Sequence, residues 1–198
     1  MRSTVILLVL AASCHQSEPV VGKAYLIEAS GTRPAPPEGA TTIEVGVTPI
    51  PAKLSGPVRV AIDRDVPYPA AIEAMHKIRA AGGTPAPLVA VRERVEELVP
   101  PDEKTGDAIN LWADPEGKAC VAPPDSVTAT CVKGQATQHI DRAFVRDVIA
   151  KAVREYDMKR VHVIVDPTVS WADAVRAIDG ARTCCGETQI EVSVTPSW

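Results

Sequence analysis

The cysteines are the residues of this chain whose spacing points most directly to chemistry. Cys120 and Cys131 lie on either side of the turn-forming segment 123–125, between two short extended runs, and this arrangement predicts a disulfide across a hairpin. Cys184 and Cys185 are adjacent, and three states stay open for them: a vicinal disulfide, bonds to other cysteines, or buried thiols. Reactive thiols at Cys184 and Cys185 would make thiol redox chemistry the alternative function of the chain.

The fifth cysteine, Cys14, follows a segment that has the layout of a secretory signal peptide. Arg2 supplies the positive start, residues 5–10 are apolar, and small residues come directly before Cys14. The apolar part is much shorter than the stretch of about 20 residues that a membrane-spanning helix needs. The sequence therefore predicts a signal peptide at 1–13 and acylation of Cys14, as at the lipobox of bacterial lipoproteins. Ordinary secretion is the alternative, because Ala11 stands where a lipobox usually has a large aliphatic residue.

Such a protein would lie on the periplasmic side of a bacterial envelope, with the lipid on Cys14 as its membrane anchor and the outer membrane as its expected location. Segment 14–40 is rich in proline and poor in apolar residues, which predicts a semi-extended tether. The net charge of −4 and the aromatic content of 4% argue against a nucleic-acid partner, since binding nucleic acid needs basic surfaces and stacking side chains.

The sequence lacks three common motifs of catalysis and cofactor binding. It contains no glycine-rich phosphate loop, no Gly-x-Ser-x-Gly nucleophile elbow and no His-Glu-x-x-His zinc motif. The four histidines show no spacing that places two ligands on one helix face, and the cysteines match no usual zinc knuckle. We therefore expect no catalytic residues, no cofactor and no metal.

An internal repeat is the most informative feature of the sequence. Segment 58–91 aligns without gaps on segment 161–194, at a constant offset of 103 positions, the difference between 161 and 58. Each copy runs from a strand rich in β-branched residues through an aspartate to an amphipathic helix, a glycine and a second strand. The positions that define the motif are Asp63, Tyr68 and Gly83 in the first copy and Asp166, Trp171 and Gly186 in the second.

The motif residues have structural interpretations that we favour over ligand binding. An aspartate after a strand accepts hydrogen bonds from backbone N–H groups of the following turn, so we expect this role at both aspartates. Tyr68 and Trp171 stand at helical spacing from apolar residues, which favours packing in the core. Gly82, Gly83 and Gly186 are expected to stop the two helices.

The order of the elements predicts an α+β fold built from two small sheet-plus-helix modules, at 41–99 and 107–198, with a linker at 100–106. The elements expected outside the repeat are a strand near 42–47, a helix over 92–98 and a helix over 141–156. One core is expected to hold Val58, Val60, Ile72 and Met75, and the other Val161, Val163, Val175 and Ile178.

The pattern of strand, Asp, Val-Pro-Tyr and helix that begins at 62–68 resembles the periplasmic domain of the ExbD/TolR biopolymer-transport family. Segment 165–171 is similar but lacks the Pro-Tyr pair. Members of that family carry an N-terminal transmembrane helix whose buried aspartate takes part in proton-driven energisation. Residues 5–13 contain no aspartate, so ion coupling is not carried over to this chain.

The resemblance implies two ExbD/TolR-like periplasmic modules, of a kind that dimerises in relatives and contacts the cell wall or a partner of the energising complex. Together with the missing catalytic motifs, it predicts a non-catalytic periplasmic lipoprotein binding module. We expect it to be accessory to a TolR/ExbD-type envelope energisation or biopolymer transport system, with envelope proteins or the cell wall as partners. An exposed edge strand would recruit a second copy or a partner strand.

Overall fold

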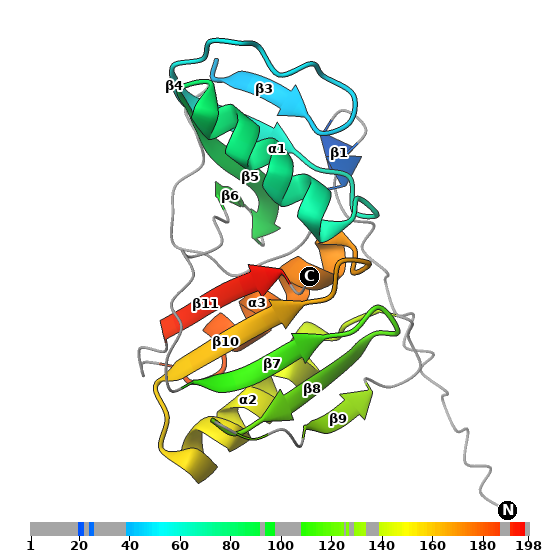
Figure 1. Ribbon diagram of the computed structural model, residues 1–198, viewed down its shortest axis with the longest axis vertical. Helices are drawn as coiled ribbons and strands as arrows, with labels where there is room; N and C mark the ends of the chain where they lie inside the picture. The colour runs from blue at the N-terminus through cyan, green and yellow to red at the C-terminus, as the bar shows by residue number, and fades with distance from the viewer. Residues whose placement is uncertain are drawn as a thin grey trace, which may run out of the picture.

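The computed structural model describes residues 20–21, 24–25, 39–91, 94–97, 108–124, 126, 129–133, 139–186 and 191–196. The predicted signal peptide, Cys14, most of the tether and the linker at 100–106 lie outside these residues. Within them the chain has three helices, a four-stranded sheet, a five-stranded sheet and a small antiparallel pair formed by β1 (Val20–Val21) and β2 (Ala24–Tyr25) (Figure 1). This mixed helix and sheet content agrees with the α+β class predicted from the sequence.

The four-stranded sheet has the order β3-β4-β5-β6, in which β3, β4 and β5 are parallel and β6 is antiparallel to β5. Its strands are β3 (Thr41–Glu44), β4 (Gly56–Ala61), β5 (Gly83–Val91) and β6 (Arg94–Glu97). Helix α1 (Tyr68–Ala80) links β4 to β5 and lies across one face of this sheet (Figure 1). The strand β6 corrects the sequence prediction of a helix over 92–98.

Two glycines follow α1, and they have different tasks. Gly82 lies directly after the capping residue Ala81 and has a φ of +94°, a conformation that glycine adopts at little cost. Gly83 instead begins β5, and a Cβ there would lie 2.9 Å from Val58 Cγ2. Gly82 is therefore the residue that stops the helix, while Gly83 allows β5 to approach β4.

The five-stranded sheet has the order β11-β10-β7-β8-β9. Its strands are β7 (Ile109–Ala113), β8 (Lys118–Ala122), β9 (Thr130–Lys133), β10 (Arg160–Val165) and β11 (Glu191–Pro196). Strand β10 is parallel to both of its neighbours, whereas β7, β8 and β9 form an antiparallel meander. Helices α2 (Arg142–Tyr156) and α3 (Trp171–Arg182) lie behind this sheet in the view of Figure 1.

The predicted helix over 141–156 is present as α2, and its start has a local cause. The carboxylate of Asp141 accepts hydrogen bonds from the backbone N–H groups of Ala143 and Phe144, at 2.9 and 3.3 Å. The helix ends at Asp157, which adopts the left-handed conformation with a φ of 50°. Asp141 and Asp157 therefore mark where α2 begins and ends.

Helices α2 and α3 pack closely, because Gly180 of α3 has no side chain to separate them. A Cβ at Gly180 would lie 2.8 Å from the carbonyl oxygen of Arg142 and 2.8 Å from Val145 Cβ. Beside this contact, Arg142 Nη1 donates to Asp179 Oδ2 at 3.1 Å, and the Asp179 side chain is fully buried. A charged pair therefore lies inside the helix–helix contact.

The buried apolar residues form one core cluster that includes side chains packed on both large sheets. All but one of the residues expected in the core are at most 1% exposed, and the exception, Ile72, is partly buried against the same cluster. The two separate cores expected from the repeat are thus a single connected core. Tyr68 and Trp171 both belong to it.

Candidate functional site

The two motif aspartates lie in turns of the same kind. Asp63 Oδ1 accepts a hydrogen bond from the backbone N–H of Asp65 at 3.1 Å. Asp166 Oδ1 accepts one from the N–H of Thr168 at 2.8 Å and a second from the Thr168 hydroxyl at 2.6 Å. These hydrogen bonds, that of the hydroxyl first, lower the pKa of Asp166. Both carboxylates therefore serve the turn after a strand, as the sequence interpretation expected.

The residues after these turns pair with one another across the molecule. The Tyr68 N–H donates to the Val169 carbonyl at 2.9 Å, and the Trp171 N–H donates to the Val66 carbonyl at 2.7 Å. Between these two hydrogen bonds, Pro67 and Ser170 form an antiparallel bridge. Tyr68 corresponds to Trp171 in the repeat, and Val66 corresponds to Val169, since each pair is 103 positions apart. The two N–H donors are therefore equivalent positions, and so are the two carbonyl acceptors. Equivalent positions of the two motifs thus meet in a reciprocal contact.

The aromatic residues of the two motifs stack at the same place. The ring centroids of Tyr68 and Trp171 are 6.2 Å apart, and the ring planes differ by 9°. The two side chains are 1% and 0% exposed, which confirms that they are core residues. Burial raises the pKa of Tyr68 above its ordinary value, and the Arg182 charge opposes this effect only in part. Stacked aromatic rings add about 0.5–1.5 kcal/mol to the effect of burial alone.

The contact between the two motifs is symmetric in its two reciprocal hydrogen bonds and in the stacked rings, but not beyond them. The Ala172 N–H also donates to the Arg64 carbonyl at 3.0 Å, but Ala172 corresponds in the repeat to Pro69, which has no N–H to donate in return. The helix starts differ as well. Ser170 caps α3 by accepting from the Asp173 N–H, whereas its counterpart, Pro67, provides no side-chain cap for α1.

A surface pocket of about 450 Å³ lies beside this contact. Its lining residues come from both motif turns, from the β7–β8 hairpin, from the chain before α2 and from the first turn of α3: Asp65, Pro115, Glu116, His139, Thr168, Ser170 and Asp173. Asp65 and Thr168 occupy equivalent positions of the two motifs. The pocket therefore depends on the contact between the two halves of the chain.

The most buried carboxylate of the pocket is already engaged with its own chain. Asp173 Oδ1 accepts from the Ile140 N–H and from Arg176 Nη1, each at 3.0 Å, and Oδ2 lies 3.3 Å from His139 Nδ1 and 3.2 Å from the Ser170 hydroxyl. Sequence reasoning did not find this group, because its members lie in two segments, 139–140 and 170–176, that are about 30 positions apart. The capping pair Ser170 and Asp173 was its only sequence signal.

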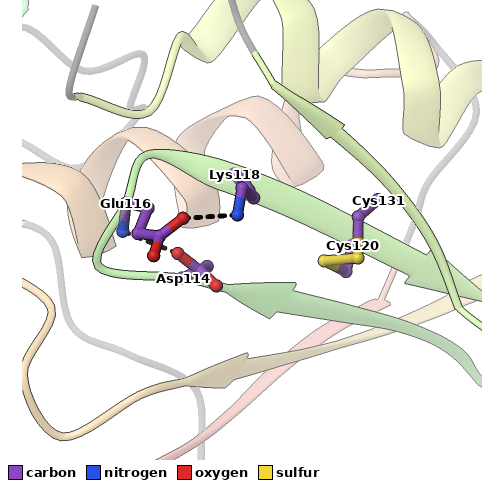
Figure 2. Close-up of a disulfide and its surroundings, with 5 residues drawn as sticks. All are labelled: Asp114, Glu116, Lys118, Cys120 and Cys131. Atoms are coloured by element: carbon purple, nitrogen blue, oxygen red, sulfur yellow. Dashed lines mark hydrogen bonds and ion pairs between the residues drawn. A yellow bond between two sulfur atoms is a disulfide. The ribbon is translucent and has the colours of Figure 1, made fainter.

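The hairpin that lines one side of the pocket is held by its own side chains (Figure 2). The Glu116 N–H donates to Asp114 Oδ1 at 2.6 Å, and the Asp114 N–H donates to the Lys118 carbonyl at 3.1 Å. Lys118 Nζ pairs with the Glu116 carboxylate, and this hydrogen bond raises the pKa of Lys118. Gly117 provides the positive φ of 75° that the turn requires.

The four cysteines after residue 100 form two disulfides. Cys120 and Cys131 face each other in the register of β8 and β9, and their disulfide joins the two strands (Figure 2). This bond confirms the predicted cross-hairpin disulfide. Cys184 and Cys185 are joined to each other, which selects the vicinal disulfide from the three open alternatives. Gly186, which follows them with a φ of +60°, lies beyond the cap of α3 and is exposed.

Neither a metal site nor a membrane-spanning helix is found in the part of the chain that the structure describes. Its His, Cys, Asp and Glu residues form no group of three or more that could hold a metal ion. None of its helices combines the length and the apolar composition that crossing a membrane requires. Comparisons with protein-family models, with curated proteins and with solved structures find no match for this chain.

Proposed function

We propose that this chain is a non-catalytic binding module of the bacterial envelope, exported to the periplasmic side and held at a membrane, the outer membrane in our proposal, by a lipid on Cys14. It consists of two ExbD/TolR-like modules related by an internal repeat. Its role is accessory to an ExbD/TolR-type envelope energisation or biopolymer transport system. The partner is an envelope protein or the cell wall.

The reciprocal contact between the two motifs carries this proposal. Contacts in which equivalent positions exchange donor and acceptor roles are characteristic of the interface in a symmetric dimer. The resemblance implies that relatives with a single module dimerise. Here the hydrogen bonds of Tyr68 and Trp171 join two motif copies within one chain. The chain would therefore act as a fused pair of modules, without needing a second copy to form this contact.

The carboxylates of the motif turns and of the pocket are engaged with groups of their own chain, which agrees with the proposed non-catalytic role. Asp63 and Asp166 are occupied by their own turns. In the pocket, Glu116 pairs with Lys118, and Asp173 pairs with Arg176.

The outermost strands of the two large sheets are the surfaces that we propose for binding. These strands are β3 and β6 in one sheet and β9 and β11 in the other. Edge strands recruit another chain, because one side of the backbone lacks strand partners. Thr42 on β3 and Thr130 on β9 are exposed, so a partner strand can reach the edge beside them.

Photo-crosslinking in the native envelope tests this proposal. A photoreactive residue at Thr42 or Thr130 is expected to give a covalent product with an envelope protein, with the cell wall or with a second copy. Glu73 provides the control, since it is exposed on α1 and lies on no edge strand. An absence of product at both edge positions, or the same product at Glu73, would count against the proposed surface. Loss of membrane attachment in Cys14→Ala tests the anchor, and unchanged fractionation would contradict it.

A further inference from the structure

The two disulfides of this chain differ in what they hold together. Cys120 and Cys131 are separated by 11 positions and join two neighbouring strands of the five-stranded sheet. Cys184 and Cys185 are separated by one position, so their bond closes only a ring within a single turn of chain. Opening the first bond removes the covalent link between β8 and β9, whereas opening the second removes no link between separate elements.

This difference predicts unequal resistance to reduction. A disulfide that closes a loop restricts the unfolded chain, and the stabilisation that it gives the fold must be lost when it is reduced. For a loop of the length between Cys120 and Cys131, this effect makes reduction about 100-fold less favourable in the folded protein than in the unfolded chain. The bond between Cys184 and Cys185 closes almost no loop and gains almost nothing from this effect.

The location of the vicinal pair allows another molecule to reach it. Thr183 caps α3 through its N–H and hydroxyl, both of which donate to the Asp179 carbonyl, so the two cysteines lie in the turn just beyond the helix. Both cysteines are partly exposed, and Cys184 packs against the edge of the core. The pair is thus accessible from outside and in contact with the packed interior.

We propose that Cys184–Cys185 is a thiol–disulfide exchange site whose substrate class is a protein dithiol, and that Cys120–Cys131 is a structural disulfide that takes no part. A thiolate of the dithiol attacks one sulfur, forming a mixed disulfide and releasing the neighbouring cysteine as a thiol after protonation. The second thiol of the dithiol then attacks the mixed disulfide. The dithiol leaves as a disulfide, and Cys184 and Cys185 have gained two electrons and two protons.

This chain is the electron acceptor in the exchange and not its catalyst. The cysteine pair lies between α3 and β11 in the sequence, and β11 is the outermost strand of the five-stranded sheet next to β10. The site is independent of the proposed envelope function, because that function rests on the contact between the motifs and on the edge strands. Either proposal can therefore fail without the other.

A redox titration of the full-length protein tests the thermodynamic difference. The protein is equilibrated with defined ratios of reduced to oxidised dithiothreitol, its free thiols are alkylated, and each cysteine pair is quantified by mass spectrometry. The same titration is made in concentrated urea, and we expect folding to raise the half-reduction ratio of Cys120–Cys131 about 100-fold and that of Cys184–Cys185 much less. Shifts of the two pairs within about threefold of one another, or a larger shift for Cys184–Cys185, would overturn the proposal.

Trapping of the mixed disulfide tests the site itself. The probe is a Cys-x-x-Cys oxidoreductase whose second cysteine is replaced by serine, so that the mixed disulfide persists. The wild-type chain and the control variant Cys120→Ser/Cys131→Ser should be captured, and Cys184→Ser/Cys185→Ser should not. Capture of the latter variant would refute the assignment, as would failure to capture the wild-type chain. The wild-type titration decides the question if the control variant does not fold.

Discussion

The buried ion pair between α2 and α3 gives a prediction whose size follows from the structure. In Arg142→Ala, the Asp179 carboxylate loses the guanidinium that lies 3.1 Å away, and the Asp179 side chain is fully buried in the wild-type protein. Removing one partner of a buried pair costs about 3–5 kcal/mol. Because the Arg142 side chain is 34% exposed, we take the lower end, about 3 kcal/mol. For a chain of this size, such a loss lowers Tm by about 6–12 °C.

Arg146 on the same helix provides a matched control for this variant. It pairs with Asp147 at 2.9 Å, but both side chains are largely exposed, so Arg146→Ala should change stability by less than about 0.5 kcal/mol. Urea denaturation followed by circular dichroism measures both variants. The double variant Arg142→Met/Asp179→Met should recover most of the loss, because it removes both charges of the buried pair together. If Arg142→Ala and Arg146→Ala were equally stable, our reasoning about this pair would be wrong.

Three further changes have defined outcomes. Gly180→Ala should destabilise the fold by about 1–2 kcal/mol in urea denaturation, because the crowding of its Cβ against the backbone of α2 outweighs the gain in helix propensity; a more stable variant would contradict the close contact. Cys120→Ser/Cys131→Ser should cost about 3 kcal/mol under non-reducing conditions, and an unchanged urea midpoint would show that the disulfide does not support the sheet. Thr168→Val should raise the pKa of Asp166 in an NMR titration, because the variant lacks the hydroxyl that donates to this carboxylate. As pH falls, the stability that Asp166 contributes above its unfolded pKa should then be lost at a higher pH than in the wild-type protein. An unmoved titration would exclude the hydroxyl as the cause.

Local patterns in the sequence were sufficient for several elements of this fold. Helix α2 follows from its apolar period and the capping carboxylate of Asp141, and α3 from its period and the cap at Ser170. The Cys120–Cys131 disulfide follows from a turn between two extended runs. In each case the signal lies within a few residues of the element that it predicts.

Strand β5 shows where local reasoning was misleading. The repeat predicts a strand at the end of segment 58–91, over 88–91, whereas β5 begins at Gly83 and includes Pro85 and Pro87, residues that are depleted in strands. Both prolines lie in the part of β5 that pairs with β4, whereas the pairing with β6 begins at Leu88. A proline is tolerated where one side of a strand has no partner to donate to. The charged run after β5 was predicted as a helix, but it pairs back onto β5 as β6.

The contacts of the candidate site could not be predicted from periodicity. The spacing of Tyr68 and Trp171 identified each as a core residue, but an apolar period does not reveal which surfaces meet. The pocket around Asp173 and His139 combines segments that lie far apart in the sequence, and it exists only because the two motif turns lie side by side. The offset of 103 positions makes Tyr68 and Trp171 equivalent in the repeat, but only the three-dimensional structure shows that the two residues are in contact.

A double-mutant cycle at Tyr68 and Trp171 tests most directly whether the two motifs pair within one chain. The free energy of unfolding is measured for the wild-type protein, for Tyr68→Leu, for Trp171→Leu and for the double variant. The stacked rings predict a coupling energy of about 0.5–1.5 kcal/mol, since the backbone hydrogen bonds beside them remain in all the variants. Additive losses, with a coupling energy below about 0.3 kcal/mol, would contradict the paired arrangement on which the proposed function rests.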